Sequence, residues 1–192
     1  MELKSLKTRT VGKKILLMEE VSSTNDEMRR LAGLGAKEGT VVIAASQAKG
    51  KGRLDRRWIS PYGGIYLSII LKPYVSPSKF PIITLLSAVA VVRTIRGLTK
   101  LDTSVKWPND IVIKGKKIGG ILCEAVKNVI IIGIGINLNT NLSIFPSSLK
   151  KQATSVKFEL GSSLNRDKVI KILLEERSTS FTEIFFITGR KR

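Results

Sequence analysis

The segment VKWPNDIVIKGKKIGGILCE, Val105–Glu124, consists of short apolar runs separated by turn residues. Pro108, Asn109 and Asp110 favour a turn after the first run, and the Lys114-Gly115-Lys116 sequence favours another. The spacing predicts strands joined by two tight turns. The sequence NVIIIGIGINL follows at residues 128–138 and predicts a central strand that ends in a glycine-punctuated loop.

The segments on either side of this region predict further strands and helices. Runs rich in β-branched and other apolar residues predict strands at residues 11–21, 40–46 and 65–71. Residues 22–34 predict a helix, in which Ser23 or Thr24 caps the start and Asp26 or Glu27 supplies the reciprocal acidic group. Asn165 predicts the cap of a final helix through residue 174. A long buried helix is predicted at residues 78–98 from apolar residues at helical spacing: Ile82, Leu85, Leu86, Val89, Val92 and Ile95.

Strands and helices that alternate in this way predict one α+β domain, with a mixed α/β sheet flanked by helices. The domain is expected to span residues 1–180, and residues 181–192 are expected to form a short basic tail or the remnant of a C-terminal domain. The region before the first strand is too short for a helix-turn-helix.

Composition excludes several classes of function. The 192 residues contain no histidine, so Ser-His-Asp triads and HExxH zinc sites are impossible. Cys123 is the only cysteine, which excludes an internal disulfide framework. No uninterrupted apolar run has the length of a membrane span, and the basic N-terminus lacks a signal-peptide core. We therefore expect a cytoplasmic protein with no membrane partner.

The net charge of +18 is the most unusual bulk property. It favours an anionic partner, such as nucleic acid, phosphate-bearing small molecules or an acidic protein. A lysine-rich solvated surface explains the same charge equally well, because the basic residues are dispersed along the chain.

The segment QAKGKGRLDRRW, Gln47–Trp58, combines glycines with basic residues. Glycine allows the backbone to approach a ligand closely, and the basic side chains suit carboxylate or phosphate oxygens. The alternative is a basic surface loop with no ligand. The GxxxxGK[ST] spacing of a P-loop is missing, which argues against an NTPase.

Two further segments are ambiguous on their own. In KWPND, Asp110 is suited to holding a lysine or a metal-bound phosphate, but a plain turn is the simpler interpretation. Lys117 stands beside Gly119 and Gly120 and suits a buried carboxylate or a reacting phosphorus, although lysines near turns are usually solvated.

Glycine and isoleucine alternate at residues 133–136, which is costly in an ordinary strand. A ligand or another backbone is therefore expected to pass close by. The amides of Asn137 and Asn139 would then face a nucleotide or hydrated Mg²⁺.

The order of these segments resembles the catalytic domain of biotin protein ligases. The resemblance covers residues 21–139 and continues weakly to 174, and it is carried by five ordered blocks: SerThrAsn at 23–25, QxxGKGRxxRxW at 47–58, KWPND at 106–110, KIGGILCE at 117–124 and GIGINLN at 133–139. It implies two steps. Biotin and ATP, with Mg²⁺, form biotinyl-5′-AMP, and a lysine of a biotin carboxyl carrier domain then takes the biotinyl group.

The resemblance also implies roles for individual residues. Ser23, Thr24, Asn25 and Gln47 are expected to bind the biotin head group. The loop residues Lys51, Gly52 and Arg53 are expected to close over biotin and the adenylate. Lys117 is expected to meet the carboxylate and the α-phosphate. The catalytic residues are thus predicted to be Lys117, Arg53 and Asp110.

The remaining implied contacts concern the nucleotide. Arg56 and Trp58 are expected to support the loop and the nucleotide, and Gly120 is expected to pack against biotin. Asn109 and Asn137 are expected near the ATP phosphates, with Mg²⁺ held mainly by those phosphates near Asn137.

Three departures from the family pattern affect these expectations. Lys51 replaces the first arginine of the usual GRGR loop, which keeps the charge but loses a bidentate donor. The C-terminal β domain is expected to be absent or reduced. The N-terminal DNA-binding domain of repressor-type ligases is expected to be missing, so no DNA partner is predicted. Edge strands beside isoleucine-rich faces favour a homodimer, by analogy with the family.

Rival interpretations remain at this point. A lipoate ligase or octanoyl transferase shares the fold and the chemistry, but the 47–58 block and KWPND match the biotin branch better. A basic nucleic-acid-binding module is disfavoured, because aromatic residues are only 6% of the chain. A third alternative is a relative that binds the ligand but has lost transfer.

Overall fold

The computed structural model describes residues 6–8, 10–72, 80–126 and 128–175. The predicted tail at 181–192 and its boundary at residue 180 lie outside the described residues. Within them, seven strands form one sheet in the order β1-β2-β3-β7-β6-β5-β4. In chain order the strands are β1 Lys14–Val21, β2 Thr40–Gln47, β3 Ile65–Leu71, β4 Thr103–Lys106, β5 Asp110–Ile113, β6 Lys116–Val126 and β7 Val129–Ile136. Only the β1–β2 pair is parallel, so the sheet is mixed, as predicted.

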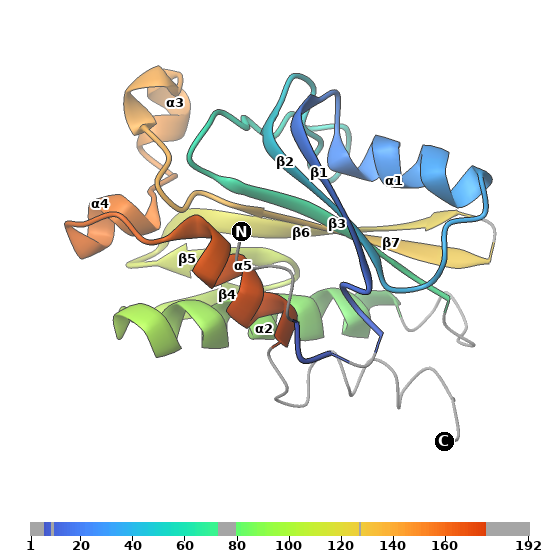
Figure 1. Cartoon of the computed structure of the whole chain (residues 1–192). Coiled ribbons are helices and arrows are strands. Elements are labelled where there is room, and N and C mark those ends of the chain that lie inside the picture. The colour runs from blue at the N-terminus through green and yellow to red at the C-terminus, as the bar shows by residue number, and fades with distance from the viewer. Residues whose placement is uncertain (1–5, 9, 73–79, 127, 176–192) are drawn as a thin grey trace.

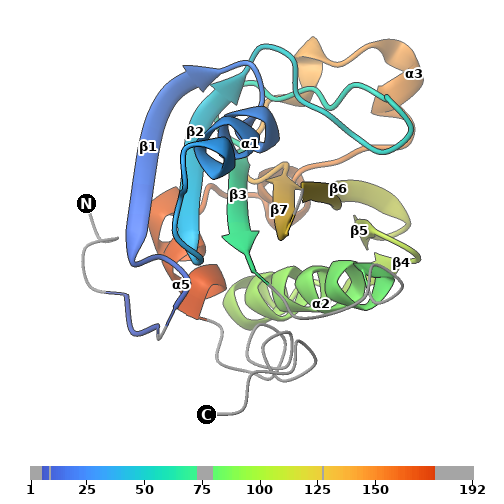
Figure 2. The same ribbon diagram turned by 90° about the vertical axis from the view of Figure 1, so that its right-hand side faces the viewer.

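Helices cover both faces of this sheet. Helix α1, Thr24–Gly33, lies on one face, while α2, Phe80–Thr99, and α5, Arg166–Glu175, lie on the other (Figures 1 and 2). The short helices η3 Leu142–Ile144, α3 Ser147–Lys150 and α4 Val156–Leu160 follow β7 at one end of the sheet. The architecture confirms the predicted α+β class.

The two central strands explain where a site can form. On β3, Ile65, Leu67, Ile69 and Leu71 belong to the large core beneath α2 and α5, because successive strand residues point to opposite faces. On β7, the isoleucines at 130, 132, 134 and 136 do the same. The α1 face carries Ser68 on β3, and Gly133 and Gly135 on β7, between larger residues. That face therefore has room for side chains of other elements where the glycines stand.

Helix α2 is long and buried along one face, as predicted, but the apolar stripe is placed differently. Ile83, Ala90, Val91 and Ile95 are buried, whereas Ile82 and Leu85 are 43% and 39% exposed. The prediction of Ile82 and Leu85 as core residues was wrong. The helix is apolar on more than one face, so hydrophobicity alone does not fix its rotation on the sheet.

Within the described residues, Pro81–Thr99 is also long and apolar enough by length and composition to cross a membrane. A core helix passes the same test, and α2 packs against the sheet and α5 with a buried face. The helix is therefore explained by packing in the core.

The helix starts confirm one predicted cap and correct another. Asn165 Oδ1 accepts a hydrogen bond from Lys168 N at 3.0 Å, as expected for the cap of α5. Ser23 occupies the cap position of α1, but its side chain makes no capping hydrogen bond. Asp26 instead accepts hydrogen bonds from side chains outside the cap, and Glu27 pairs with Arg30. The start of α1 is thus organised around side-chain contacts rather than a capping box.

Candidate active site

A cavity that is open to solvent lies on the α1 face of the sheet over the glycines of β7. Its lining contains most of the residues predicted from the sequence: Ser23, Thr24, Asn25, Gln47, Lys51, Gly52, Arg53, Trp58, Asn109, Lys117 and Gly120. Residues from four separate parts of the chain therefore meet at one site.

One end of the cavity is polar and uncharged. Gln47 Oε1 accepts hydrogen bonds from the backbone N and the hydroxyl of Thr24, at 2.8 and 3.1 Å. Gln47 Nε2 donates to Ser60 Oγ at 2.8 Å. Because the amide of Gln47 is held on both sides, the start of α1 is fixed against β2. The hydroxyl of Ser23 is not used for capping and suits a ligand with N–H and C=O groups.

Ser68 holds two residues of this end in place, and it was not among the residues predicted from the sequence. Its hydroxyl lies 2.6 Å from Asn25 Oδ1 and 2.8 Å from Thr24 Oγ1. Ser68 is fully buried in the middle of β3. A serine that interrupts the apolar run IYLSIIL was the available signal, since a buried hydroxyl needs a partner.

The alternating glycines of β7 make room for side chains. A Cβ at Gly133 would collide with the amide of Asn25, and one at Gly135 would lie 2.7 Å from Trp58 Nε1. Other groups do approach these glycines closely, but they are side chains, whereas a ligand or another backbone was predicted. Residues two apart on a strand are separated by about 7 Å. Asn25 and Trp58 therefore stand about that far apart along the cavity floor.

The loop that follows β2 forms one wall of the cavity. Lys51 pairs with Arg57 as an antiparallel bridge, and Gly52 N donates to Arg56 O at 2.7 Å. Leu54 and Asp55 have φ values of 55° and 56°, so the tip turns in the left-handed region. The segment is a short hairpin that carries basic side chains over the cavity.

The other end of the cavity is cationic. Lys117 Nζ lies 2.6 Å from Asp110 Oδ1 and 5.4 Å from the centre of the Trp58 ring. Arg53 donates to Asn109 Oδ1 at 3.1 Å, which brings a second cation to the same end. Such an arrangement suits an anionic group on the ligand.

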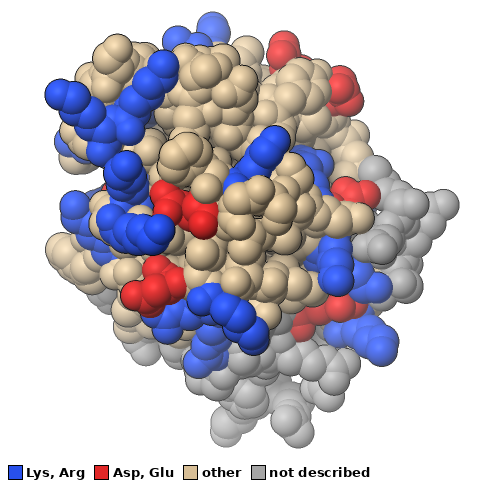
Figure 3. All heavy atoms as spheres, turned by 90° about the vertical axis from the view of Figure 1, so that its left-hand side faces the viewer, with Lys and Arg blue, Asp and Glu red and all other residues tan. Residues whose placement is uncertain are grey.

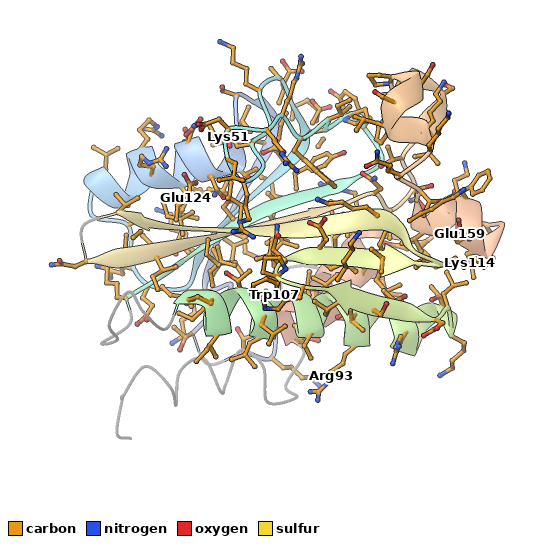
Figure 4. All side chains as sticks on the ribbon, turned by 180° about the vertical axis from the view of Figure 1, so that it is seen from behind. Lys51, Arg93, Trp107, Lys114, Glu124 and Glu159 are labelled. Atoms are coloured by element: carbon orange, nitrogen blue, oxygen red, sulfur yellow. The ribbon has the colours of Figure 1, made fainter. Side chains whose placement is uncertain are left out.

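The backbone of Lys117 is held in place by the segment after β7. Lys117 N donates to Gln152 O at 2.8 Å, and Thr154 N donates to Lys117 O at 2.9 Å. Thr154 and Lys114 both contact Glu159, at 2.8 and 3.2 Å, and Figure 4 shows Lys114 beside Glu159. Burial alone would raise the pKa of Glu159, but these two contacts outweigh burial, and the pKa is below its ordinary value.

Several predicted residues do not line the cavity. Arg56 is exposed outside it, and Asp110 is placed beside it through Lys117. Asn137 is 1% exposed and donates to Thr154 O at 3.1 Å. Asn139 uses both amide atoms on the backbone of Leu164. The amides of Asn137 and Asn139 thus bond to the segment after β7, although the buried Oδ1 of Asn137 has no hydrogen-bond partner among the described residues. A role of either residue toward a nucleotide stays a prediction.

The described part of the chain contains no group of three or more His, Cys, Asp or Glu residues arranged to hold a metal ion. Mg²⁺ carried mainly by ATP phosphates stays a prediction. Figure 3 shows that Lys and Arg on one face occur in several groups with carboxylates between them, rather than as one continuous basic patch.

The profile of the biotin/lipoate A/B protein ligase family matches residues 17–141, about two-thirds of the chain and nearly the whole sheet. The fold and the site define the same class of protein, a single mixed sheet with a small-molecule cavity over its centre. The chain belongs to the biotin/lipoate A/B protein ligase family.

Individual relatives come from the biotin branch of this family. The bifunctional ligase/repressor BirA of Bacillus spizizenii is 44% identical over 88% of this chain and 54% of its own length. The biotin protein ligase of Aquifex aeolicus, solved in complex with biotin and ATP, is 31% identical with a TM-score of 0.80, over 91% of this chain and 72% of that one. A Leishmania major biotin protein ligase in complex with biotinyl-5-AMP is 26% identical with a TM-score of 0.72, over 94% and 85% of the two chains. The chain spans about half the length of the BirA relative.

Proposed function

We propose that this protein activates biotin with ATP to form biotinyl-5′-AMP, and then transfers the biotinyl group to a lysine of a biotin carboxyl carrier domain. The observation that carries the proposal is the asymmetry of the cavity. Uncharged hydrogen-bonding groups stand at the end near Asn25, and cations stand about 7 Å along the floor, near Trp58. Biotin has the same asymmetry, with a neutral ureido head and a carboxylate tail.

The chain's own residues account for the first step by position and charge. The head group binds near Ser23 and Gln47, which directs the carboxylate toward Lys117. A carboxylate oxygen bonds to the α-phosphorus of ATP, and pyrophosphate leaves. Lys117 and Arg53 offset the negative charge that gathers at this end, which is the main requirement of such a reaction. No histidine is needed, because the reaction depends on orientation more than on proton transfer.

The second step forms a carbon–nitrogen bond. The amine of the acceptor lysine attacks the carbonyl carbon of the mixed anhydride, AMP leaves, and the attacking nitrogen loses a proton. Asp110 is the carboxylate nearest to Lys117 and belongs to the site through that contact. We assign Asp110 a positioning role, in which it holds Lys117 in place for both steps.

The relatives support this proposal through what their names state. The Aquifex aeolicus structure contains biotin and ATP, and the Leishmania major structure contains biotinyl-5-AMP. The BirA relative is named as a repressor as well as a ligase. For this chain we expect a cytoplasmic enzyme and no DNA partner. A gel-shift assay tests the DNA expectation, and salt-sensitive binding to duplex DNA would contradict it.

The central experiment incubates the protein with labelled biotin, Mg-ATP and a biotin carboxyl carrier domain. We expect label on the acceptor lysine and, when the acceptor is omitted, labelled biotinyl-AMP. Octanoate and lipoate are run in parallel, because the rival activity of this family uses them. Activation of lipoate or octanoate in preference to biotin would refute the proposal, and so would the absence of any adenylate.

A further inference from the structure

A row of ionic contacts connects the loop over the cavity to helix α1 and strand β6. Lys51 Nζ lies 2.6 Å from Asp26 Oδ1, and the same oxygen accepts a hydrogen bond from Arg29 at 2.6 Å. Arg29 also donates to Glu124 Oε1 at 2.6 Å. Figure 4 shows Lys51 and Glu124 on the same side of the sheet, close to α1. Two cations and two carboxylates thus alternate along the row.

The row continues into the floor of the cavity through Asn25. Asn25 Nδ2 donates to the second oxygen of Glu124 at 2.5 Å, and Asn25 Oδ1 accepts from Ser68 Oγ at 2.6 Å. Asn25 is 3% exposed and lines the cavity. A single chain of contacts therefore runs from the loop to the uncharged end of the site, where the head group is proposed to bind.

Lys51 contacts a different part of the protein from Arg53, the other loop cation that lines the cavity. Arg53 contacts Asn109 at the cationic end, whereas the ammonium of Lys51 is committed to Asp26 on α1, 25 residues away in the chain. The row is neutral overall, so it does not add to the positive charge that faces an anionic ligand. An ammonium has one compact charge and suits a single carboxylate oxygen.

We propose that Asp26 is a positioning residue that holds the loop 50–58 closed over the cavity through Lys51. Arg29 and Glu124 tie this contact to Asn25, so that closure of the loop and order at the head-group end support each other. The inference rests on the proposed function for what the cavity retains, namely biotinyl-AMP. The geometry assigns Asp26 no contact with the reacting atoms.

The exposure of the Lys51–Asp26 ion pair determines how strongly it can hold the loop closed. The side chains of Lys51 and Asp26 are 44% and 32% exposed, so solvent screens their attraction. Pairs of this kind change an equilibrium by about twofold to fivefold. The contact is therefore expected to govern how long the loop stays closed, without deciding whether the protein folds.

The first test measures the release rate of biotinyl-AMP after a single turnover without acceptor. Asp26→Asn and Lys51→Met should each increase this rate by about twofold to fivefold. The double variant should be no faster than Asp26→Asn, because that change already removes the contact with Lys51 as well as the one with Arg29. Lys51→Arg should retain slow release. Unchanged release in Asp26→Asn, or effects that multiply in the double variant, would overturn the proposal.

Glu27→Gln is the matched control. Glu27 is the next residue on α1 and is paired with Arg30 on the same helix, so its loss removes a carboxylate and an ion pair without touching the loop. We expect its release rate to equal that of the unchanged protein. Faster release in Glu27→Gln would show that helix charge, and not the loop contact, sets the rate, which would also overturn the proposal.

A second measurement is independent of activity. Trypsin cleavage within the loop, followed by mass spectrometry on the ligand-free protein, reports how often the loop opens. Asp26→Asn should speed this cleavage by about twofold to fivefold, and Glu27→Gln should not. If the unchanged protein forms no adenylate, the proposed function fails, while the cleavage rates still decide the role of Asp26. Equal cleavage rates in the unchanged protein, Asp26→Asn and Glu27→Gln would refute the positioning role of Asp26.

Discussion

The Lys117→Ala variant is expected to lose catalytic activity while the protein keeps most of its stability. Lys117 is about a third exposed and makes one ion pair, with Asp110, and one contact over the Trp58 ring. Loss of a partly exposed pair costs about 1 kcal/mol or less in the free energy of unfolding. Loss of a group that stabilises charge in a transition state costs about 10²–10³ in rate, or about 3–4 kcal/mol. We expect the second loss to be several times larger than the first.

Two assays measure these losses on the same variant. Biotin-dependent exchange of pyrophosphate into ATP reports formation of the adenylate, and urea unfolding reports stability. Lys116→Ala is the control, because Lys116 is exposed on the same strand and outside the cavity lining. It should retain both exchange and stability. Lys117→Ala with full exchange activity would refute the assignment of Lys117, and a stability loss above about 3 kcal/mol would refute the estimate from exposure.

Three further predictions concern single residues of the sheet and of the segment after it. Glu159→Gln should lower the free energy of unfolding by about 1 kcal/mol or less at neutral pH, because it weakens the ion pair with the largely exposed Lys114. Since the folded pKa of Glu159 is lowered, this difference should be present above the unfolded pKa of about 4.5 and should vanish as the pH falls through the folded value, as acid and urea titrations can show. Burial raises the pKa of Cys123 to about 11, so its thiol should react with iodoacetamide far more slowly in the folded protein at pH 8 than in urea. Gly135→Ala should displace the Trp58 indole and weaken biotin binding in calorimetry, whereas Gly115→Ala, in an open turn with φ of 75°, should lower stability without changing affinity.

Local patterns predicted most of the fold. The strand at residues 65–71 matches β3 at both ends, because an apolar β-branched run bounded by turn residues has few other interpretations. The rotation of α2 was predicted wrongly, because apolar residues occur around much of its surface and only the shape of the sheet selects Ile83 over Ile82. The helices of four and five residues, α3 and α4, are too short for a periodic signal.

The site was predictable where several residue types combine in one motif. The block at 47–58 and Lys117 were identified in this way. Lys117 lines the cavity together with five residues of the block, namely Gln47, Lys51, Gly52, Arg53 and Trp58. Ser68 and the contact between Asp26 and Lys51 were missed, because each depends on residues brought together across the chain. Asn137 was assigned to the nucleotide from its place in a motif, but its amide is bonded to Thr154. A sequence motif shows which polar residues belong to the site, but it does not show which partner each of them is bonded to.

The position of β7 between β3 and β6 has a consequence for the order of folding. Ile136 of β7 pairs with Ile65 of β3. The centre of the sheet therefore forms only after the chain through β7 is available. The cavity floor is β7 itself, which means that no earlier fragment contains a binding site. Pairing of strands this distant in sequence is slow compared with helix formation. We expect biotin to recognise only chains that have completed this pairing, so that added biotin slows unfolding without accelerating folding.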